Sequence, residues 1–394
     1  MRDVIAIQDL QFGSTGKGQI AGSVAHVWHP DTVVTAWGPN AGHTFRKGGK
    51  KWVHTMLATS ALAPSVEQIL IGPGSVLNVE KLAEEIDAAR DLLRGKQLVI
   101  HPQAPVVNAG HALAESTELL RIGSTMKGTG AALCDKIMRK EVTVRSNASD
   151  VIESLGRATM QADMSLSISS KIYDRCVDLS GKMIVEGAQG FSLGVHNDFY
   201  PHTTSRDVST AQLIADCRLP FPTRSEHRFR VLGVARTFPI RVANRARQHD
   251  NGTEEVFTSG GCYVDQQEIQ WDDIGRVPEL TTVTKLPRRL FSFSFEQLIE
   301  ACRIMAPDQL ALTFCDYLIP PDVIEGSGER VALGDNVWQF VNNIEQCVRP
   351  FVEVVSFGPT MEDVYERTRN GPDDRGLSPI SGAFLGMGEP DVVG

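Results

Sequence analysis

Residues 11–18 form the segment of this sequence whose composition and spacing point most directly to chemistry, with glycines at positions 13, 16 and 18 around Lys17. The segment follows the apolar run Val4–Ile7 and precedes a helical pattern from Gln19 to Trp28, so we expect a buried strand, a glycine-rich turn and a helix. Such a turn presents several backbone N–H groups and one ammonium to an anion. It is not a Walker A loop, because no Ser or Thr follows Lys17. The segment predicts a phosphate site, with a plain strand-to-helix turn as the alternative.

Turn-rich segments with glycines, hydroxyls and a histidine recur along the rest of the chain. Taken singly, each could be an ordinary loop; taken as a set, they could form a site for a phosphorylated ligand. The segments are residues 40–44, 71–74, 122–130, 186–190, 200–205, 281–284 and 356–359.

Short β-branched runs alternate with helical patterns, which predicts an α/β fold with a mostly parallel central sheet flanked by helices. One helix is expected from a cap at Asn78 through Leu93, with Gly95 just past its end. Ligands of such sheets bind at the carboxyl ends of the strands, where residues 11–18 would lie. We expect a single domain over residues 1–394 with small insertions, and residues 244–276 read as a polar, irregular loop or insertion. The expected strands are residues 4–7, 32–36, 68–71, 97–100, 183–185, 230–235, 309–313 and 352–356.

Composition excludes several classes of protein. The formal net charge of -9 argues against a nucleic-acid binder, since such proteins carry an excess of Lys and Arg. The seven cysteines are scattered and never in C-x-x-C spacing, so neither a disulfide framework nor a zinc site is indicated. We find neither a signal pattern nor a long apolar segment and therefore expect no membrane partner and a cytoplasmic location, in the host cytoplasm if the protein is encoded by a phage.

In their order and nearly end to end, these segments resemble the adenylosuccinate synthetase family. That family joins aspartate to the 6-position of a purine nucleotide with a nucleoside triphosphate and Mg²⁺. The oxygen at C6 is a poor leaving group, so it is first phosphorylated and the phosphate is then displaced by the amine of aspartate. Removing the N1 proton makes O6 nucleophilic, and the transferring phosphoryl group needs a cation and hydrogen-bond donors around it.

The resemblance assigns roles to residues of this chain. It implies that Lys17, His43 and Ser14 are catalytic, with His43 as the general acid or electrophile at O6, and that Ser14 and the Gly42 carbonyl bind Mg²⁺. Arg139 matches an arginine that reaches the substrate phosphate in the partner subunit, which implies a homodimer. The implied triphosphate-binding residues are Gly13, Ser14, Thr15, Gly16, Lys17, Gly18, Gly42, His43, Thr44, Asp316, Ser356, Gly358 and Pro359. The substrate nucleotide would be bound by Ser14, Asn40, Ser124, Thr125, Arg139, Gln189 and Thr204, and aspartate by Thr282, Val283, Thr284 and Arg288.

The chain departs from the usual family pattern at Ser14, where the family carries an aspartate that acts as the N1 base and a Mg²⁺ ligand. An aspartate there would crowd a 2-amino group on the purine, whereas serine leaves space and can accept a hydrogen bond from it. Ser14 and Thr15 therefore look like the phage branch of the family, which acts on dGMP and supplies a precursor of 2-aminoadenine. The N1 proton must then go to another group, either a water molecule or Asp9.

Two further departures concern the sugar and the donor. Leu286 stands in the place of an arginine that meets the ribose 2′-hydroxyl, which is consistent with a deoxynucleotide. Phe314 replaces the lysine of the motif that reads the donor base, while Asp316 is retained. Asp316 alone would favour GTP, but the phage branch uses an adenine nucleotide, and we expect ATP or dATP.

The leading hypothesis is thus a ligase that uses dGMP, L-aspartate, Mg²⁺ and ATP or dATP. The alternatives are an ordinary adenylosuccinate synthetase that uses IMP, aspartate and GTP, and a purine-nucleotide sensor that has lost catalysis. The missing aspartate at position 14 supports the sensor, and the retained His43 and Lys17 argue against it.

Overall fold

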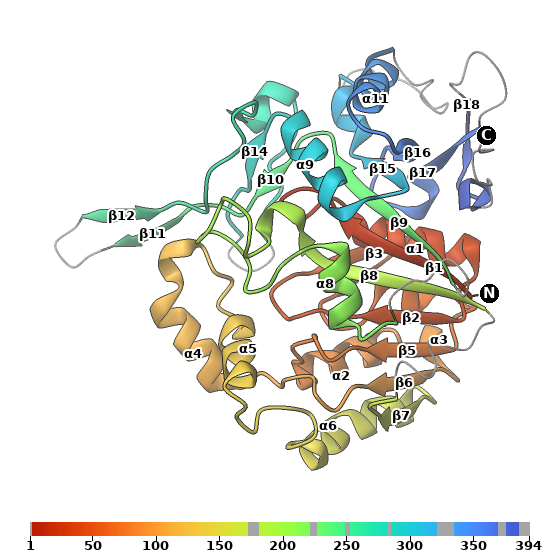
Figure 1. Cartoon of the computed structure of the whole chain (residues 1–394), viewed down its shortest axis with the longest axis vertical. Coiled ribbons are helices and arrows are strands. Elements are labelled where there is room, and N and C mark those ends of the chain that lie inside the picture. Colours follow the sequence, from red (N-terminus) through yellow and green to blue (C-terminus); the bar gives the residue numbers. More distant parts are fainter. Residues whose placement is uncertain are drawn as a thin grey trace.

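An eleven-stranded sheet runs through the centre of the molecule, with helices packed on both of its faces (Figure 1). The computed structural model describes residues 2–171, 181–220, 227–248, 253–281, 285–320, 335–368 and 376–385. The strand order is β18-β17-β16-β15-β9-β1-β8-β2-β5-β6-β7. All pairs from β16 to β7 are parallel, and only the edge pairs β16–β17 and β17–β18 are antiparallel. The predicted fold class is therefore confirmed.

All eight strands that the sequence predicts are present, and β5, β6 and β15 have the predicted bounds. β1 is central because Ile5, Ala6 and Ile7 have no accessible surface, as a strand covered on both faces requires. The strands of the sheet are β1 Arg2–Asp9, β2 Thr32–Thr35, β5 Gln68–Ile71, β6 Gln97–Ile100, β7 Ser165–Ile168, β8 Lys182–Gly190, β9 His227–Arg236, β15 Gln309–Thr313, β16 Phe351–Ser356, β17 Val364–Thr368 and β18 Gly376–Pro379.

The helices cover the sheet with apolar faces. The predicted helix 78–93 begins as expected, since the Asn78 side chain accepts from Lys81 N at 2.8 Å, but it breaks at Ala89 into two helices. The helices are α1 Lys17–Trp28, α2 Val79–Ala88, α3 Arg90–Leu93, α4 Ala109–Glu118, α5 Thr129–Ile137, α6 Ala148–Gln161, α8 Thr210–Asp216, α9 Phe295–Met305 and α11 Asp335–Cys347, and the short 3-10 turns are η1 Thr59–Leu62, η2 Leu120–Ile122, η3 Phe191–Leu193, η4 Trp271–Ile274, η5 Cys315–Leu318, η6 Met361–Asp363 and η7 Ala383–Leu385.

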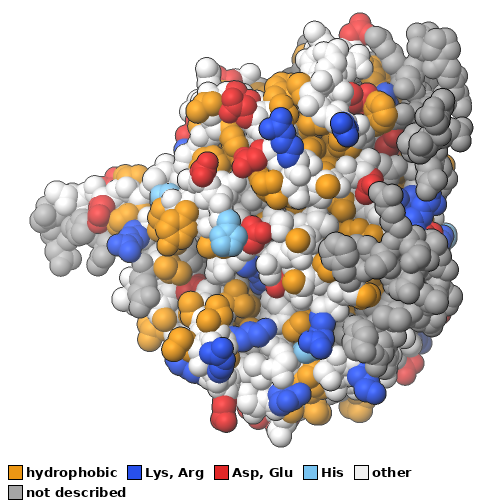
Figure 2. Space-filling view, viewed as in Figure 1, with side chains coloured by type: hydrophobic (Ala, Val, Ile, Leu, Met, Phe, Trp, Pro, Cys, Tyr) orange, Lys and Arg blue, Asp and Glu red, His pale blue; other side chains and the backbone are white. Residues whose placement is uncertain are grey.

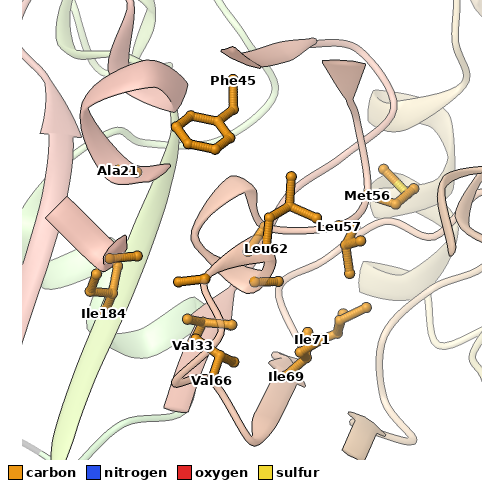
Figure 3. Packing of buried hydrophobic residues seen from close by; sticks show 14 of the residues in the cluster. Ala21, Val33, Phe45, Met56, Leu57, Leu62, Val66, Ile69, Ile71 and Ile184 are labelled. Carbon is orange, nitrogen blue, oxygen red and sulfur yellow. The ribbon is translucent and has the colours of Figure 1, made fainter. Parts of the chain in front are cut away.

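The largest apolar cluster lies between α1, η1 and α2 on one face of the sheet (Figure 3). Phe45 in this cluster comes from β3 and packs on Gly22 of α1, where a Cβ would lie 2.3 Å from the ring. Only glycine at position 22 allows this approach. The contact fixes β3 (His43–Lys47) and its partner β4 (Lys50–His54) against the first helix.

The prediction that residues 244–276 are irregular was partly wrong. They contain a hairpin of β11 (Arg245–Gln248) and β12 (Glu254–Phe257), which projects from the body of the molecule in Figure 1. They also contain β13 (Glu268–Ile269), which pairs with β14 (Arg289–Phe291), and β14 pairs in turn with β10 (Ile240–Arg241). The strands were not predicted because their composition is polar. The β11–β12 ribbon is exposed on both faces and therefore lacks the apolar alternation that indicates a strand.

Candidate functional site

The segment of residues 11–18, called the glycine loop below, leaves β1 and enters α1 at Lys17. Gly13, Ser14 and Gly16 have φ of 86°, 56° and 77°, so the chain turns through three left-handed residues. The loop is held from below by Asp9, whose carboxylate accepts from Gln11 N at 2.9 Å, Gly13 N at 3.2 Å, Thr15 N at 3.3 Å and Thr15 Oγ1 at 2.6 Å. Burial raises the pKa of Asp9 despite these hydrogen bonds. Asp9 thus braces the loop, and its engaged oxygens speak against a role as the N1 base.

The Glu186–Gly190 segment at the end of β8 lies directly beside the glycine loop. A Cβ at Gly190 would lie 2.1 Å from Gly13 N, so only glycine allows the two backbones to approach. Gln189, which precedes it, has a left-handed backbone with φ of 60°. Gly190 therefore lies against residues 11–13, and the next residue of the glycine loop, Ser14, is exposed.

His43, Lys17 and Trp37 form a compact group at the start of α1. The imidazole stacks on the Trp37 indole, with 3.8 Å between ring centroids and 18° between planes. Lys17 Nζ lies 3.1 Å from His43 Nδ1, and an ammonium can only donate, so Nδ1 accepts and the ring proton sits on Nε2. Burial and the charges of Lys17 and His54 hold the pKa of His43 well below its usual range. Nε2 is buried and has no hydrogen-bond partner among the described residues. The result is a neutral imidazole with one free N–H donor.

Lys17 itself is buried, with 4% of its surface exposed. Burial lowers the pKa of its ammonium to about 8, opposed by the carboxylates of Glu186 and Asp9. Its Nζ also donates to the Gly187 carbonyl, which accepts from Trp37 Nε1 at 3.2 Å. The lysine is therefore a positive charge whose position is fixed before any ligand binds.

Glu186 supplies the matching negative charge. Its carboxylate accepts from Ser60 N at 2.7 Å and Thr59 Oγ1 at 3.0 Å, and also from Ser60 Oγ. Burial raises its pKa, while those hydrogen bonds and Lys17 act in the opposite direction.

The segment that follows β15 packs against the opposite side of the glycine loop. Thr313 Oγ1 donates to Thr15 O at 2.7 Å, and a Cβ at Gly16 would lie 3.5 Å from the Phe314 ring. Burial raises the pKa of the nearby Asp316 to about 6. Ser356 ends β16, the next strand, and its Oγ donates to the Gly358 carbonyl at 3.0 Å.

The residues assigned to the substrate nucleotide lie on several elements. Asn40 lies near the start of α5, since a Cβ at Gly38 would lie 3.2 Å from Asn40 Oδ1 and 3.0 Å from Thr129 Cγ2. Ser124 Oγ accepts from Met126 N at 3.1 Å in the turn before that helix. Thr204 is joined to Leu193 by a backbone hydrogen bond of 2.7 Å. Of the other assigned residues, Thr125 is partly buried in the same turn as Ser124, Thr44 is partly buried beside Gly18, and Gly42 and Pro359 are exposed.

Arg139 is exposed with φ of 61°, and it follows the C-terminal end of α5, whereas Ser124 precedes the N-terminal end of that helix. Arg288 N donates to the Glu279 carbonyl at 2.8 Å, and burial lowers the pKa of its guanidinium. Thr282, Val283 and Thr284 lie outside the described residues.

Four residues that touch the predicted ones were missed by the sequence analysis: the buried Trp37, Glu186 (as a charge partner) and Arg236, and the partly buried Glu279. Glu186 opens one of the recognised segments and could have been found from it. Arg236 ends a strand without any motif around it, and only the folded chain brings it to Ser14.

Figure 2 shows Lys and Arg side chains gathered over the lower half of the face seen, where Figure 1 has α4, α5 and α6. Asp and Glu are more frequent over the upper half (Figure 2). This uneven distribution suits an anionic ligand despite the net charge of -9. Among the described helices, none combines the length and apolar character needed to cross a bilayer.

The described residues contain no group of three or more His, Cys, Asp or Glu side chains that could hold a metal ion.

Comparison with known proteins identifies the family of the chain. The family model for adenylosuccinate synthetase matches residues 6–171 and 146–326. The N6-succino-2-amino-2′-deoxyadenylate synthase of Salmonella phage PMBT28 is 42% identical over 366 residues, covering 91% of this chain and 96% of that protein. The succinoaminodeoxyadenylate synthetase of cyanophage S-2L, solved with dGMP and with dATP as an energy donor, is 38% identical with a TM-score of 0.79, covering 94% of this chain and 97% of that one.

A more distant solved structure shows the same fold. The fully ligated adenylosuccinate synthetase of Plasmodium falciparum is 18% identical with a TM-score of 0.71, covering 93% of this chain and 100% of that one. The chain thus belongs to the adenylosuccinate synthetase family, on the branch of the phage N6-succino-2-amino-2′-deoxyadenylate synthases.

Proposed function

We propose that the protein is a ligase that joins L-aspartate to C6 of dGMP at the expense of ATP or dATP. In the first step O6 attacks the γ-phosphorus of the donor, and ADP or dADP leaves. In the second step the amine of aspartate attacks C6, inorganic phosphate leaves with the C6–O bond pair, and the amine loses its proton. The product is 2-amino-2′-deoxy-N6-succinyladenylate, a precursor of 2-aminoadenine for phage DNA. We place the reaction in the host cytoplasm, where these nucleotides are made.

The observation that carries this proposal is the similarity to the phage synthases over nine-tenths of the chain, and the serine at position 14 supports it. The serine leaves room for the 2-amino group of guanine, and its hydroxyl can accept a hydrogen bond from it. Leu286, which has no donor to offer a 2′-hydroxyl, is consistent with a deoxynucleotide.

In this proposal the free N–H of His43 donates to O6 and to the phosphoryl group that it receives. A neutral donor suits this task because it stabilises the developing negative charge without first needing to be protonated. Lys17 and the N–H groups of the glycine loop hold the γ-phosphate. Ser14 is a poor base, and Asp9 is occupied by the loop, so we assign removal of the N1 proton to a water molecule.

The donor would lie against Thr44, Phe314, Asp316 and the Ser356–Pro359 turn. Phe314 is an apolar platform for either purine, so the preference for an adenine nucleotide rests on the dATP of the cyanophage relative. Mg²⁺ would be held by oxygens of Ser14 and Gly42, both exposed, together with donor phosphates and water. The bound ion neutralises charge on the transferring phosphoryl group. Arg288 would bind a carboxylate of aspartate through paired N–H groups.

We also propose a homodimer in which Arg139 reaches the substrate phosphate of the partner. Support comes from its position at the far end of α5, next to Ile137 and Met138, which are 71% and 70% exposed. Two large apolar side chains this exposed suit a covered interface.

The test is to incubate the purified protein with aspartate, Mg²⁺ and ATP, to offer dGMP or IMP in turn, and to measure phosphate release and succinylated product. We expect turnover with dGMP. Turnover with IMP and GTP alone would instead indicate an ordinary adenylosuccinate synthetase, and tight dGMP binding without turnover at any pH would indicate a sensor.

A further inference from the structure

Arg236 and Glu279 form an ion pair beside the proposed site. The Arg236 guanidinium has no accessible surface, and it donates to the two carboxylate oxygens of Glu279, a partly buried side chain, at 2.5 and 3.4 Å. Taking a guanidinium out of water is costly, so such a pair is weak evidence of a role in stability. Its other contacts indicate what it does.

On one side Arg236 of the pair hydrogen-bonds to the glycine loop. Arg236 Nη1 donates to the carbonyl of Ser14, which has φ of 56°, at 3.0 Å. Ser14 is the residue that the proposed function assigns to both nucleotides. The Arg236 backbone is fixed at the start of the same loop, because its N–H donates to Gln11 Oε1 at 2.8 Å and its carbonyl accepts from Gln11 Nε2 at 3.1 Å. Arg236 therefore holds the loop at two points.

On the other side the pair contacts residues 279–281 and 285–288, the described part of the chain assigned to aspartate, called the amino-acid segment below. A short ladder closes the base of this segment: Arg288 N donates to Glu279 O at 2.8 Å, and Thr281 N donates to Leu286 O at 2.9 Å. Burial works to raise the pKa of Glu279, but Arg236 outweighs it and the pKa lies below the usual value, so the side chain is a carboxylate at neutral pH. A shift of this ladder would move the Glu279 carboxylate, to which Arg236 donates.

A third contact extends the network to the donor side. The guanidinium stacks on the Phe314 ring at 3.8 Å from its centroid, and Tyr317 Oη donates to Glu279 Oε1 at 3.1 Å. One guanidinium thus touches the segments proposed to bind the phosphates, the donor base and the amino acid.

We propose that the Arg236–Glu279 pair couples binding at the amino-acid segment to the geometry of the glycine loop, which makes Arg236 a positioning residue for phosphoryl transfer. The inference rests on the proposed function for the ligands of the two segments. It predicts that aspartate and the donor strengthen each other's binding, since coupling between two sites is reciprocal.

Calorimetric titration tests this with adenylyl imidodiphosphate, a non-hydrolysable ATP analogue, in the presence of dGMP and Mg²⁺, with and without saturating L-aspartate. For the unaltered protein we expect aspartate to tighten binding of the analogue by about tenfold. In Glu279→Gln we expect this factor to fall to about one, with binding in the absence of aspartate changed by less than about threefold. The amide keeps the shape of the carboxylate and can still accept a hydrogen bond from Arg236.

The chain offers a matched control in Glu268, whose carboxylate accepts from Arg289 Nε at 2.8 Å and Nη2 at 2.6 Å and touches neither the glycine loop nor Phe314. Glu268→Gln should keep the full coupling factor. Arg236→Lys keeps the charge without the fork of N–H groups and should lose the coupling as Glu279→Gln does. Tyr317→Phe is the mildest variant and should lower the factor only in part.

The coupling would be overturned if aspartate tightened binding of the analogue equally in Glu279→Gln and in the unaltered protein. It would also be overturned if aspartate had no effect on binding of the analogue in the unaltered protein. Failure of the proposed function looks different: the analogue, dGMP and aspartate would bind with the expected coupling, while dGMP and ATP gave no succinylated product.

Discussion

The glycine loop and the amino-acid segment are both turns beside the same proposed reaction, yet they are held in different ways. The glycine loop is fixed by the buried carboxylate of Asp9, by Gly190 and by Thr313, which come from three strands of the central sheet. The described residues of the amino-acid segment are joined by a ladder, Glu279 is held by Arg236, and Leu286 is 40% exposed. We infer that the donors for a transferring phosphoryl group are fixed in advance by the central sheet, whereas the described residues of the amino-acid segment are held mainly by their own ladder and by Arg236.

The strongest test of this contrast is to remove the fixed groups. Lys17→Ala or His43→Ala should lower kcat on the order of one hundredfold or more, because each group acts on charge that develops in the transition state. Steady-state phosphate release checks this, together with circular dichroism to show that the variant is folded. Near-normal turnover in either variant would remove that residue from the mechanism.

Lys96 provides a matched control for Lys17. It is equally buried, and its Nζ donates to the carbonyls of Ala61 and Ala63 at 2.8 and 2.6 Å, far from the glycine loop in sequence and in contacts. Lys96→Met should lower the melting temperature, because two carbonyls lose their donor, while kcat stays within about twofold.

The amino-acid segment should respond through KM. Arg288→Met should raise the KM for aspartate by roughly tenfold to one hundredfold and leave the KM for dGMP unchanged, since a guanidinium–carboxylate contact contributes about 1.5–3 kcal/mol. The neighbouring Arg289, which pairs with Glu268, is the control, and Arg289→Met should leave the KM for aspartate unchanged. An unaltered KM in Arg288→Met would assign aspartate to other residues.

Ser14 tests whether the exposed tip of the glycine loop selects the base. Ser14→Asp should lower the ratio of kcat/KM for dGMP over IMP by about tenfold or more, because the carboxylate would crowd the 2-amino group. Parallel assays with the two nucleotides measure the ratio. An unchanged preference would show that selection lies elsewhere.

The smallest expected effect is the change of kcat/KM and of stability with pH. The pKa of Lys17 is lowered to about 8, so kcat/KM should fall on the alkaline side of that value as the ammonium is lost. Stability should move the other way: between pH 8 and 10.5 the unfolded chain binds this proton more tightly than the folded one, so the contribution of Lys17 to the free energy of unfolding rises with pH. A kcat/KM profile that is flat from pH 7 to about 9.5 would contradict the role of a charged lysine.

The sequence predicted the features that depend on local pattern. Apolar runs such as Gln97–Ile100 gave strands with correct bounds, and Asn78 marked the start of a helix because capping depends on residues three positions apart. The spacing of glycines around Lys17 indicated the glycine loop, and the family resemblance supplied the role of His43 and the substrate class. The assignments at Thr282–Thr284 stay predictions.

What the sequence could not predict are the long-range polar contacts. Arg236 lies 222 residues from Ser14 and 43 from Glu279, and no spacing rule links them. Trp37 likewise reads as a core residue until β2 and β3 place its ring against the imidazole. The exposed β11–β12 hairpin was missed because it has no apolar face.

The packing of Phe45 on Gly22 has a consequence for how substrate preference can change during evolution in this family. The Phe45 ring packs so closely on Gly22 that no side chain would fit there, and this contact fixes the strand that carries the His43 imidazole. With the roles proposed above, a lineage can exchange residue 14, proposed to lie beside the purine, without disturbing His43, the proposed proton donor two residues before Phe45 on β3. New base preferences would then be within reach of single substitutions, while the groups proposed to activate the oxygen are retained.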